Sequence, residues 1–415
     1  MPQSVASVRV SYTPLYGERH GGGGGGGACC GVLTVDETRL LLDCGWDDGF
    51  SVEQLEALRG VVPTVSGVLI SHGELEYCGG LPYAFAHLGL QAPVFMTRAC
   101  QRLARVALHE ALVSLDSCSV FEAVRLSDVD AALGLASSGG LVRDVRAHET
   151  VSVGGVTVEA FPAGRTLGGA MWSVSKLSEK ILYAVGIGGV RSVLSGRCVL
   201  ADAERSSAKE ALRSLLRPTL CITDANDGAP LQSAWDSMSG ERLCLCLAGV
   251  ARKGGDALVL TDAAAHLLEV GTAVEQALER SRRAAEAVAT TGVTLVVVGT
   301  HAKTLLERAR VEEGHDRLSS IGLRAGARGG RAVHVDSPLR WKRIKVVGSI
   351  QEAAALPRPR AVITFLPSLE LGPAHVILSH FARDKNSAVI YTQRPRPNTL
   401  AARLLLTAHQ TRAEK

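Results

Sequence analysis

A histidine, two glutamates and a tyrosine follow one short apolar segment of the chain. Residues 68–70 predict a buried strand, and His72, Glu74, Glu76 and Tyr77 come directly after it. Two glycines and an apolar run come next, which predicts a loop leading into a helix. Imidazole and carboxylate groups bind zinc at about 2.0–2.2 Å and can support metal-assisted hydrolysis. The spacing therefore directs attention to a metal site at the end of a strand.

The loop resembles the metal-binding loop of the metallo-β-lactamase superfamily, in which His-x-His-x-Asp-His binds two zinc ions. The resemblance also implies a histidine ligand at position 165 and a bridging aspartate at position 186, where this chain has arginine and glycine. A guanidinium cannot be deprotonated to bind zinc, and glycine has no ligand side chain. We therefore expect no bound metal, no cofactor and no catalytic residue. The degenerate ligand positions are His72, Glu74, Glu76, Tyr77, Arg165 and Gly186.

Two acidic side chains that we expect near Arg165 suggest how the missing positive charge of the metal ions could be replaced. Glu74 and Glu76 would repel each other without a cation, so we expect Arg165 to form an ion pair with them in place of the metal. Side chains that point to solvent are the simpler alternative. Asp224 keeps the acidic character of the next family motif, and we expect it to cap or pack.

Composition indicates an ordinary globular protein. The chain has 415 residues, 46% of them hydrophobic and 21% charged, which is enough for two domains. No apolar stretch approaches the length of a membrane helix, and the N-terminus lacks the pattern of a secretion signal, so we expect an intracellular protein without a membrane contact. Ten scattered cysteines without a C-x-x-C pair indicate reduced thiols. P-loop, nucleophile-elbow and dinucleotide-binding motifs are absent from the sequence.

The pattern of strands and helices changes along the chain. The first half has short strand pairs, among them residues 150–153 and 156–161 joined by two glycines, which predict a hairpin. From about residue 228, strands and helices alternate, which predicts a parallel sheet covered by helices. We place domains at residues 1–226 and 227–415. The glycine run at 21–27 is expected to be a loop.

Several colinear blocks carry a more specific resemblance. They are residues 39–48 (RLLLDCGWDD), 71–90 (SHGELEYCGGLPYAFAHLGL), 126–132 (LSDVDAA), 162–172 (PAGRTLGGAMW), 181–185 (ILYAV), 222–224 (ITD) and 385–391 (KNSAVIY). In this order they resemble the subunit 2 family of the cleavage and polyadenylation specificity factor. That family is a catalytically silent branch of the metallo-β-lactamase/β-CASP proteins.

The resemblance implies the fold and the role. The fold would be α/β, a metallo-β-lactamase-like αββα sandwich with an inserted β-CASP domain. The role would be that of a non-catalytic scaffold subunit in pre-mRNA 3′-end processing in the nucleus. The implied partners are the endonuclease subunit, the other subunits of the complex, and pre-mRNA. The family also supplies closing strands of the first domain after the β-CASP domain, and this chain stops soon after residues 400–406, so we expect either a fragment or a partner that covers the open sheet edge.

Two alternatives stay open at the level of the sequence. A weak metal-dependent RNA hydrolase could use His72, Glu74, Glu76 and Asp224 with a metal that prefers oxygen ligands, such as manganese. The second alternative is an inactive β-CASP subunit of the Integrator complex, which would also lack catalysis but would belong to a different complex. Residues 43–48 favour the polyadenylation factor.

A basic stretch between residues 324 and 345 is the candidate for contact with RNA or a partner. The net charge of +4 permits such a contact without requiring it. A solvated loop is the alternative for this stretch. The basic residues are Arg324, Arg328, Arg331, Arg340, Lys342, Arg343 and Lys345.

Overall fold

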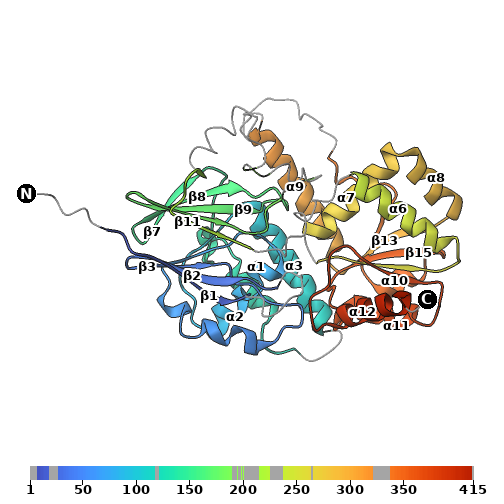
Figure 1. Cartoon of the computed structure of the whole chain (residues 1–415), viewed down its shortest axis with the longest axis horizontal. Coiled ribbons are helices and arrows are strands. Elements are labelled where there is room, and N and C mark those ends of the chain that lie inside the picture. Colours follow the sequence, from blue (N-terminus) through green and yellow to red (C-terminus); the bar gives the residue numbers. More distant parts are fainter. Residues whose placement is uncertain are drawn as a thin grey trace, which may run out of the picture.

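The computed structural model has two lobes that lie side by side (Figure 1). It describes residues 7–17, 27–116, 121–188, 194, 198, 200, 215–224, 237–262, 265–320 and 337–413. We call the lobe that contains the first eleven strands the sandwich lobe, and the lobe that contains the last five strands the parallel lobe.

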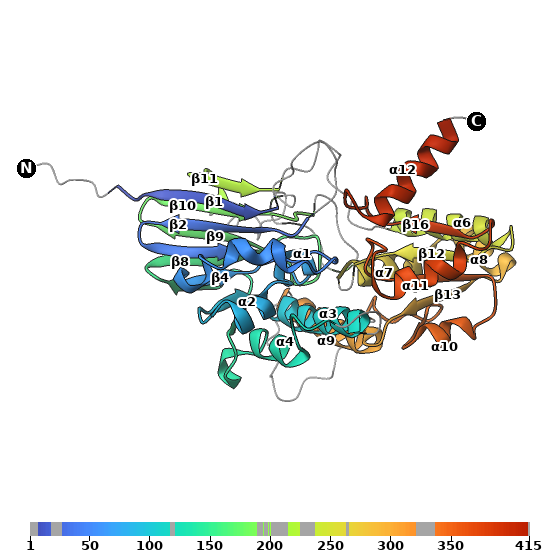
Figure 2. The same ribbon diagram turned by 90° about the horizontal axis from the view of Figure 1, so that it is seen from below.

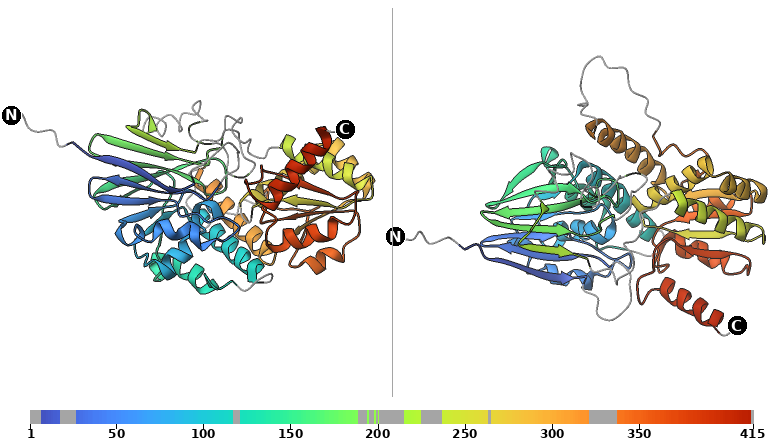
Figure 3. Two further views of the ribbon diagram at one scale, coloured as in Figure 1. Left: turned by 60° about the horizontal axis from the view of Figure 1, so that its bottom comes forward. Right: turned by 45° about the horizontal axis from the view of Figure 1, so that its top comes forward.

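The sandwich lobe contains two stacked sheets (Figure 3). The first has the order β1 to β6, antiparallel through β3 and parallel from there on. Its strands are β1 (Val10–Tyr16), β2 (Cys30–Val35), β3 (Thr38–Leu42), β4 (Gly67–Leu69), β5 (Val94–Met96) and β6 (Val142–Asp144). The second has the order β11-β10-β9-β8-β7. Its strands are β7 (Thr150–Val153), β8 (Val156–Pro162), β9 (Ala170–Lys176), β10 (Glu179–Ala184) and β11 (Leu220–Thr223).

Alternating apolar residues on facing strands explain why the two sheets stack. Leu40 and Leu42 of β3 pack with Trp172 and Val174 of β9 in one buried cluster, because every second residue of a strand faces the same side. The predicted hairpin between β7 and β8 is confirmed, and Gly154 and Gly155 have φ values of 55° and 90°, which glycine adopts at low cost.

Helices cover the outer face of the first sheet (Figure 2). They are η1 (Val52–Leu58), η2 (Val62–Thr64), α1 (Leu75–Cys78), α2 (Leu81–His87), α3 (Arg98–Asp116), α4 (Leu126–Ala132) and η3 (Ala136–Ser138). On the outer face of the second sheet, Phe161 and Met171 pack with Cys198 and Leu215. Together with the sheet order, this confirms the metallo-β-lactamase-like sandwich that the sequence predicts.

The parallel lobe has the sheet order β14-β13-β15-β12-β16, with every pair parallel. Its strands are β12 (Ala257–Leu260), β13 (Thr294–Val298), β14 (Lys345–Val347), β15 (Arg360–Thr364) and β16 (Ala388–Tyr391). Its helices are α6 (Ser237–Ala251), α7 (Ala265–Arg280), α8 (Arg282–Thr291), α9 (Ala302–Ser320), α10 (Ile350–Ala354), α11 (Gly372–Phe381) and α12 (Leu400–Ala413). Val259 packs under one helical layer and Leu258 under the other, so the predicted parallel sheet with helices on both faces is confirmed.

Helices α3 and α9 join the lobes, lying against each other (Figures 1 and 2). Arg102 of α3 pairs with the buried Glu312 of α9. The buried carboxylate of Glu110 accepts hydrogen bonds from the backbone N–H of Thr300, at 3.0 Å, and of His301, just before α9 begins. The predicted domain boundary at residues 226 and 227 lies outside the described residues. None of the described helices is long and apolar enough to cross a membrane.

Candidate functional site

The loop after β4 is held by a buried aspartate that follows β3. Asp43 is fully buried, and its carboxylate accepts hydrogen bonds from Ser71 N and Ser71 Oγ, both at 2.7 Å, and from the Tyr183 hydroxyl at 2.6 Å. Ser71 Oγ in turn lies 2.9 Å from His72 Nδ1. Burial raises the pKa of Asp43 to about 7, against the hydrogen bonds, which lower it. Sequence reasoning missed the roles of Asp43 and Tyr183, because these roles are visible only in the hydrogen bonds that the fold brings together.

His72 is the one predicted ligand position that keeps its residue type. Its side chain is buried, and burial together with the charge of Arg165 lowers its pKa to about 3, so the imidazole is neutral. The ring lies beside that of Tyr77, with 4.7 Å between centroids. A lone neutral imidazole in this place is available for packing but lacks the neighbours that would complete a metal site.

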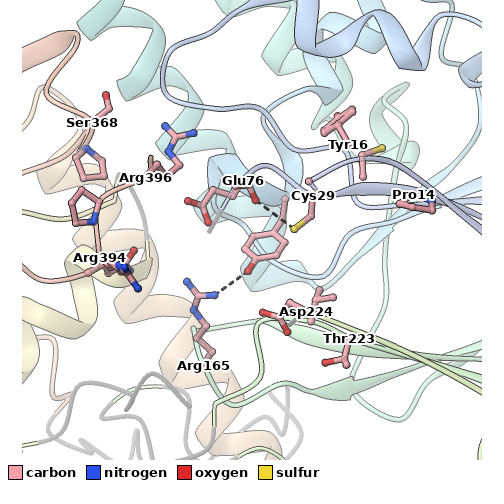
Figure 4. Close-up of a pocket in the computed structure, with 18 of the residues that line it drawn as sticks. Pro14, Tyr16, Cys29, Glu76, Arg165, Thr223, Asp224, Ser368, Arg394 and Arg396 are labelled. Carbon is pink, nitrogen blue, oxygen red and sulfur yellow. Dashed lines mark hydrogen bonds between the residues drawn. The ribbon is translucent and has the colours of Figure 1, made fainter. Parts of the chain in front are cut away.

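Tyr77 and Arg165, which replace two histidines, bond to each other. Arg165 Nη1 donates a hydrogen bond of 2.9 Å to the Tyr77 hydroxyl, and its guanidinium carbon lies 5.9 Å from the centre of the tyrosine ring (Figure 4). Burial raises the pKa of Tyr77 well above its usual value, so the phenol stays protonated. Neither side chain can act as a zinc ligand in these states.

Gly186 packs closely against the rings of His72 and Tyr77. It has a φ of 57°, and a Cβ atom placed there would lie 2.9 Å from His72 Cε1 and 3.0 Å from the Tyr77 hydroxyl oxygen. A Cβ contact under 3.0 Å is essentially never seen, and one of 3.0 Å is unusually tight, so an aspartate would have to displace the rings. Tyr77 therefore occupies the room that a side chain at position 186 would need.

The two glutamates of the loop lie near Arg165 without pairing with it. Burial raises the pKa of Glu74 to about 7 and that of Glu76 to about 8; Asp262 of the parallel lobe raises both further, and Arg165 lowers both. Among the described residues, the hydrogen bond of Arg165 goes to Tyr77, and neither glutamate comes within ion-pair distance of it. The predicted ion pair is therefore wrong, and the guanidinium bonds to the tyrosine hydroxyl instead.

A cavity of about 470 Å³ lies between the two lobes at this loop. Glu76, Tyr77 and Arg165 line it from the sandwich lobe, and Arg394 and Arg396 line it from the loop after β16 (Figure 4). Asp224, directly after β11, is exposed and also lines it. Sequence reasoning placed Asp224 near the loop but missed both arginines, which come 170 and 172 residues after Asp224 in the chain.

Arg396 forms a second link between the lobes. It pairs with Asp47 and Asp48 of the sandwich lobe, and Asp48 Oδ2 also accepts a hydrogen bond of 2.9 Å from Ser368 N of the parallel lobe. Arg396 and Ser368 both line the cavity, so this link borders it.

The described part of the predicted basic stretch does not line the cavity. Arg324, Arg328 and Arg331 fall outside the described residues, and Arg340, Lys342, Arg343 and Lys345 are exposed. Two of these side chains face acidic partners on α7, since Lys342 lies 3.7 Å from Glu279 and Arg343 lies 3.6 Å from Glu275. None of the exposed four lines the cavity. Contact with RNA or a partner therefore stays a prediction for this stretch.

The residues at the ligand positions do not fit a pair of zinc ions. In the part of the chain that the structure describes, no three His, Cys, Asp or Glu side chains are grouped so that they could hold a metal ion. The reason is local, because a phenol, a guanidinium and a glycine occupy positions that would need imidazoles and a carboxylate.

Comparison with known proteins agrees with this fold. Residues 32–222 match the family model described as metallo-beta-lactamase superfamily domain, so this part of the chain is a metallo-β-lactamase domain. Over about 90% of its length, the chain is similar to proteins named cleavage and polyadenylation specificity factor subunit 2, which confirms the resemblance in the sequence.

Three relatives illustrate the extent of this similarity. The chain is 27% identical over 382 residues to "Probable cleavage and polyadenylation specificity factor subunit 2" of Drosophila melanogaster, covering 90% of this chain and 46% of that protein. It is 28% identical over 389 residues to the protein of the same name in Caenorhabditis briggsae, with coverages of 91% and 42%. It is 29% identical over 375 residues to "Cleavage and polyadenylation specificity factor subunit 2" of Oryza sativa, with coverages of 90% and 47%. The chain spans about half the length of these relatives.

Proposed function

We propose that this chain is a non-catalytic subunit of a cleavage and polyadenylation factor that acts in pre-mRNA 3′-end processing. It would work in the nucleus, pair with the endonuclease subunit, contact the other subunits and contribute to RNA binding. The names of the relatives support the assignment to 3′-end processing. One observation supports the non-catalytic role above all: Arg165 donates to Tyr77 where two histidine ligands would be needed.

The physical argument concerns the attacking water. Hydrolysis in this fold needs a cation to lower the pKa of a bound water to about 7. A guanidinium has no lone pair for a cation, and the neutral phenol oxygen of Tyr77 is a poor ligand that already accepts a hydrogen bond from Arg165. The fixed positive charge of Arg165 also repels a cation at short range. His72, Glu74, Glu76 and Asp224 remain for the alternative of a weak manganese-dependent hydrolase. The positive charge of Arg165 lies close to Glu74 and Glu76 and disfavours binding of a metal ion there.

The test uses the full chain, alone and with its presumed partner. We expect purified protein to contain less than a tenth of a zinc or manganese ion per chain by mass spectrometry and to leave single-stranded RNA uncut, with or without added manganese. We also expect it to coelute on a sizing column with the endonuclease subunit of the factor. Manganese-dependent cleavage abolished by His72→Ala would support the hydrolase and overturn the proposal. Coelution with the Integrator nuclease instead would reassign the complex.

A further inference from the structure

We propose that the cavity between the lobes binds a phosphodiester group of single-stranded RNA, with Arg165 and Arg394 as the phosphate-binding residues. The inference rests on the proposed role in RNA processing and assigns a ligand to the same site. The guanidinium would supply the positive charge that a metal ion supplies elsewhere, without activating a water.

Arg165 provides a fixed donor group on the sandwich side. Its guanidinium carries five N–H donors in a plane, and the hydrogen bond from Nη1 to Tyr77 fixes its direction. This is its single hydrogen bond to the described part of the chain, and the side chain lines the cavity. A guanidinium group stays protonated in proteins, so the positive charge of Arg165 is permanent. Planar guanidinium groups match the oxygen pairs of a phosphate.

Arg394 provides the second donor group, from the parallel lobe. It is exposed, lines the same cavity, and has no hydrogen bond or ion pair within the described residues. Arg396, two residues on, is the contrast, because Asp47 and Asp48 neutralise it. In Figure 4 the side chains of Arg394 and Arg165 both reach toward the space beside Glu76. One phosphate between them would contact both lobes.

The other lining residues indicate a nucleotide unit instead of a polyanion. Asp224 and Glu76 carry acidic groups, which oppose a highly charged ligand but can accept hydrogen bonds from ribose hydroxyls or base amino groups. Tyr12 and Tyr16 add aromatic surface of the kind on which bases stack. A volume of about 470 Å³ lies within the usual range of about 300–1,000 Å³ for small-ligand sites. A single phosphodiester with one neighbouring base agrees with this mixture.

The experiment measures binding of the full chain to three probes by calorimetry at low salt. The probes are a diadenosine dinucleotide with one phosphodiester, adenosine, and inorganic phosphate. We expect the dinucleotide to bind more tightly than adenosine, and Arg394→Gln to weaken it about tenfold. Arg165→Gln should have a similar or larger effect. Since Arg165 is part of the packed site and its replacement can unfold the loop, the exposed Arg394 carries the test.

A matched control removes the same charge elsewhere. Arg283→Gln, exposed on α8 at the far end of the parallel lobe, should leave dinucleotide binding unchanged. Inorganic phosphate that binds as well as the dinucleotide, and is lost in Arg394→Gln, would support the phosphate site and assign it to free phosphate. Equal binding of dinucleotide and adenosine, or binding that Arg394→Gln does not change, would overturn the inference. Such a result would not affect the coelution test of the proposed function, so each of the two proposals can fail without the other.

Discussion

The hydroxyl of Tyr77 accepts a hydrogen bond of 2.9 Å from Nη1 of Arg165. These residues are 88 positions apart in the sequence and come from opposite sheets of the sandwich, one after β4 and the other after β8. Their contact connects the two loops that metal ions would otherwise connect. The replacements at the ligand positions therefore form a packed alternative structure, as the close fit of Gly186 also shows.

Gly186→Ala should destabilise the protein. The added Cβ atom meets His72 at 2.9 Å and Tyr77 at 3.0 Å, at a positive φ that alanine adopts only with strain. We expect the free energy of unfolding to fall by about 2–4 kcal/mol in urea denaturation. Gly249→Ala on α6 is the control, since its Cβ meets nothing within 4 Å, and it should be neutral or slightly stabilising. Equal effects of the two substitutions would contradict the packing argument.

Chelation should not change thermal stability. Structural zinc stabilises folded proteins strongly, so its removal by EDTA lowers the melting temperature of proteins that depend on it. Here Tyr77 and Arg165 fill the site from within the chain. We expect the melting temperature to agree within a degree or so, with and without EDTA, by differential scanning fluorimetry. A fall of several degrees that added zinc reverses would show that this site, or another part of the chain, holds a metal.

The pH dependence of stability should show the buried carboxyl group of Glu74. Its folded-state pKa of about 7 lies above the usual value, so between about pH 4.5 and 7 the folded protein holds a proton that the unfolded chain releases. The protonated carboxyl group of Glu74 therefore contributes its full stabilisation at low pH, and this stabilisation is lost as the pH rises through about 7. Glu74→Gln should make the fall in unfolding free energy over pH 5–7 shallower, by at most about 1.4 kcal/mol per pH unit.

An exposed glutamate gives the control for this experiment. Glu307→Gln on α9 removes the same charge at an exposed position and should leave the slope as it is in the unmodified protein. Asp43 and Glu76 also have raised pKa values, of about 7 and 8, so part of the slope should persist in Glu74→Gln. An unchanged slope in Glu74→Gln would mean that its carboxyl group is ionised in the folded protein.

Glu110→Ala should loosen the contact between the lobes. The substitution leaves the backbone N–H groups of Thr300 and His301 without their acceptor at the start of α9. We expect a loss of about 2–4 kcal/mol of stability and faster cleavage between the lobes in limited proteolysis. Asp116→Asn, exposed at the end of the same helix α3, should have little effect on either measurement. Unchanged proteolysis of Glu110→Ala would mean that other contacts hold the lobes together.

Local patterns sufficed to predict part of this structure. The hairpin of β7 and β8 follows from two adjacent glycines, and the parallel lobe follows from the alternation of strands and helices. The sandwich of two sheets was predicted from the resemblance to a known family, which several colinear blocks of residues carry. These features depend on neighbours in the sequence or on a similar chain as a whole.

The contacts of the site could not be predicted in the same way. Arg165 lines the cavity with Glu76, but which side chain it bonds to depends on the three-dimensional packing of the loop, and the sequence alone did not indicate Tyr77. The support of the loop by Asp43 and the reach of Arg394 into the cavity depend on how strands and lobes meet. Such contacts between distant residues leave no periodic signal in a single sequence.

The fit between Gly186 and the two rings also limits how this site can change. An aspartate at position 186 collides with His72 and Tyr77, and a histidine at position 165 would leave the tyrosine hydroxyl without its donor. These two steps toward a two-zinc centre each disturb the packing before a metal could bind, so positions 77, 165 and 186 would have to change together. The packing of Tyr77, Arg165 and Gly186 thus opposes a gradual evolutionary change of this site into a metal site.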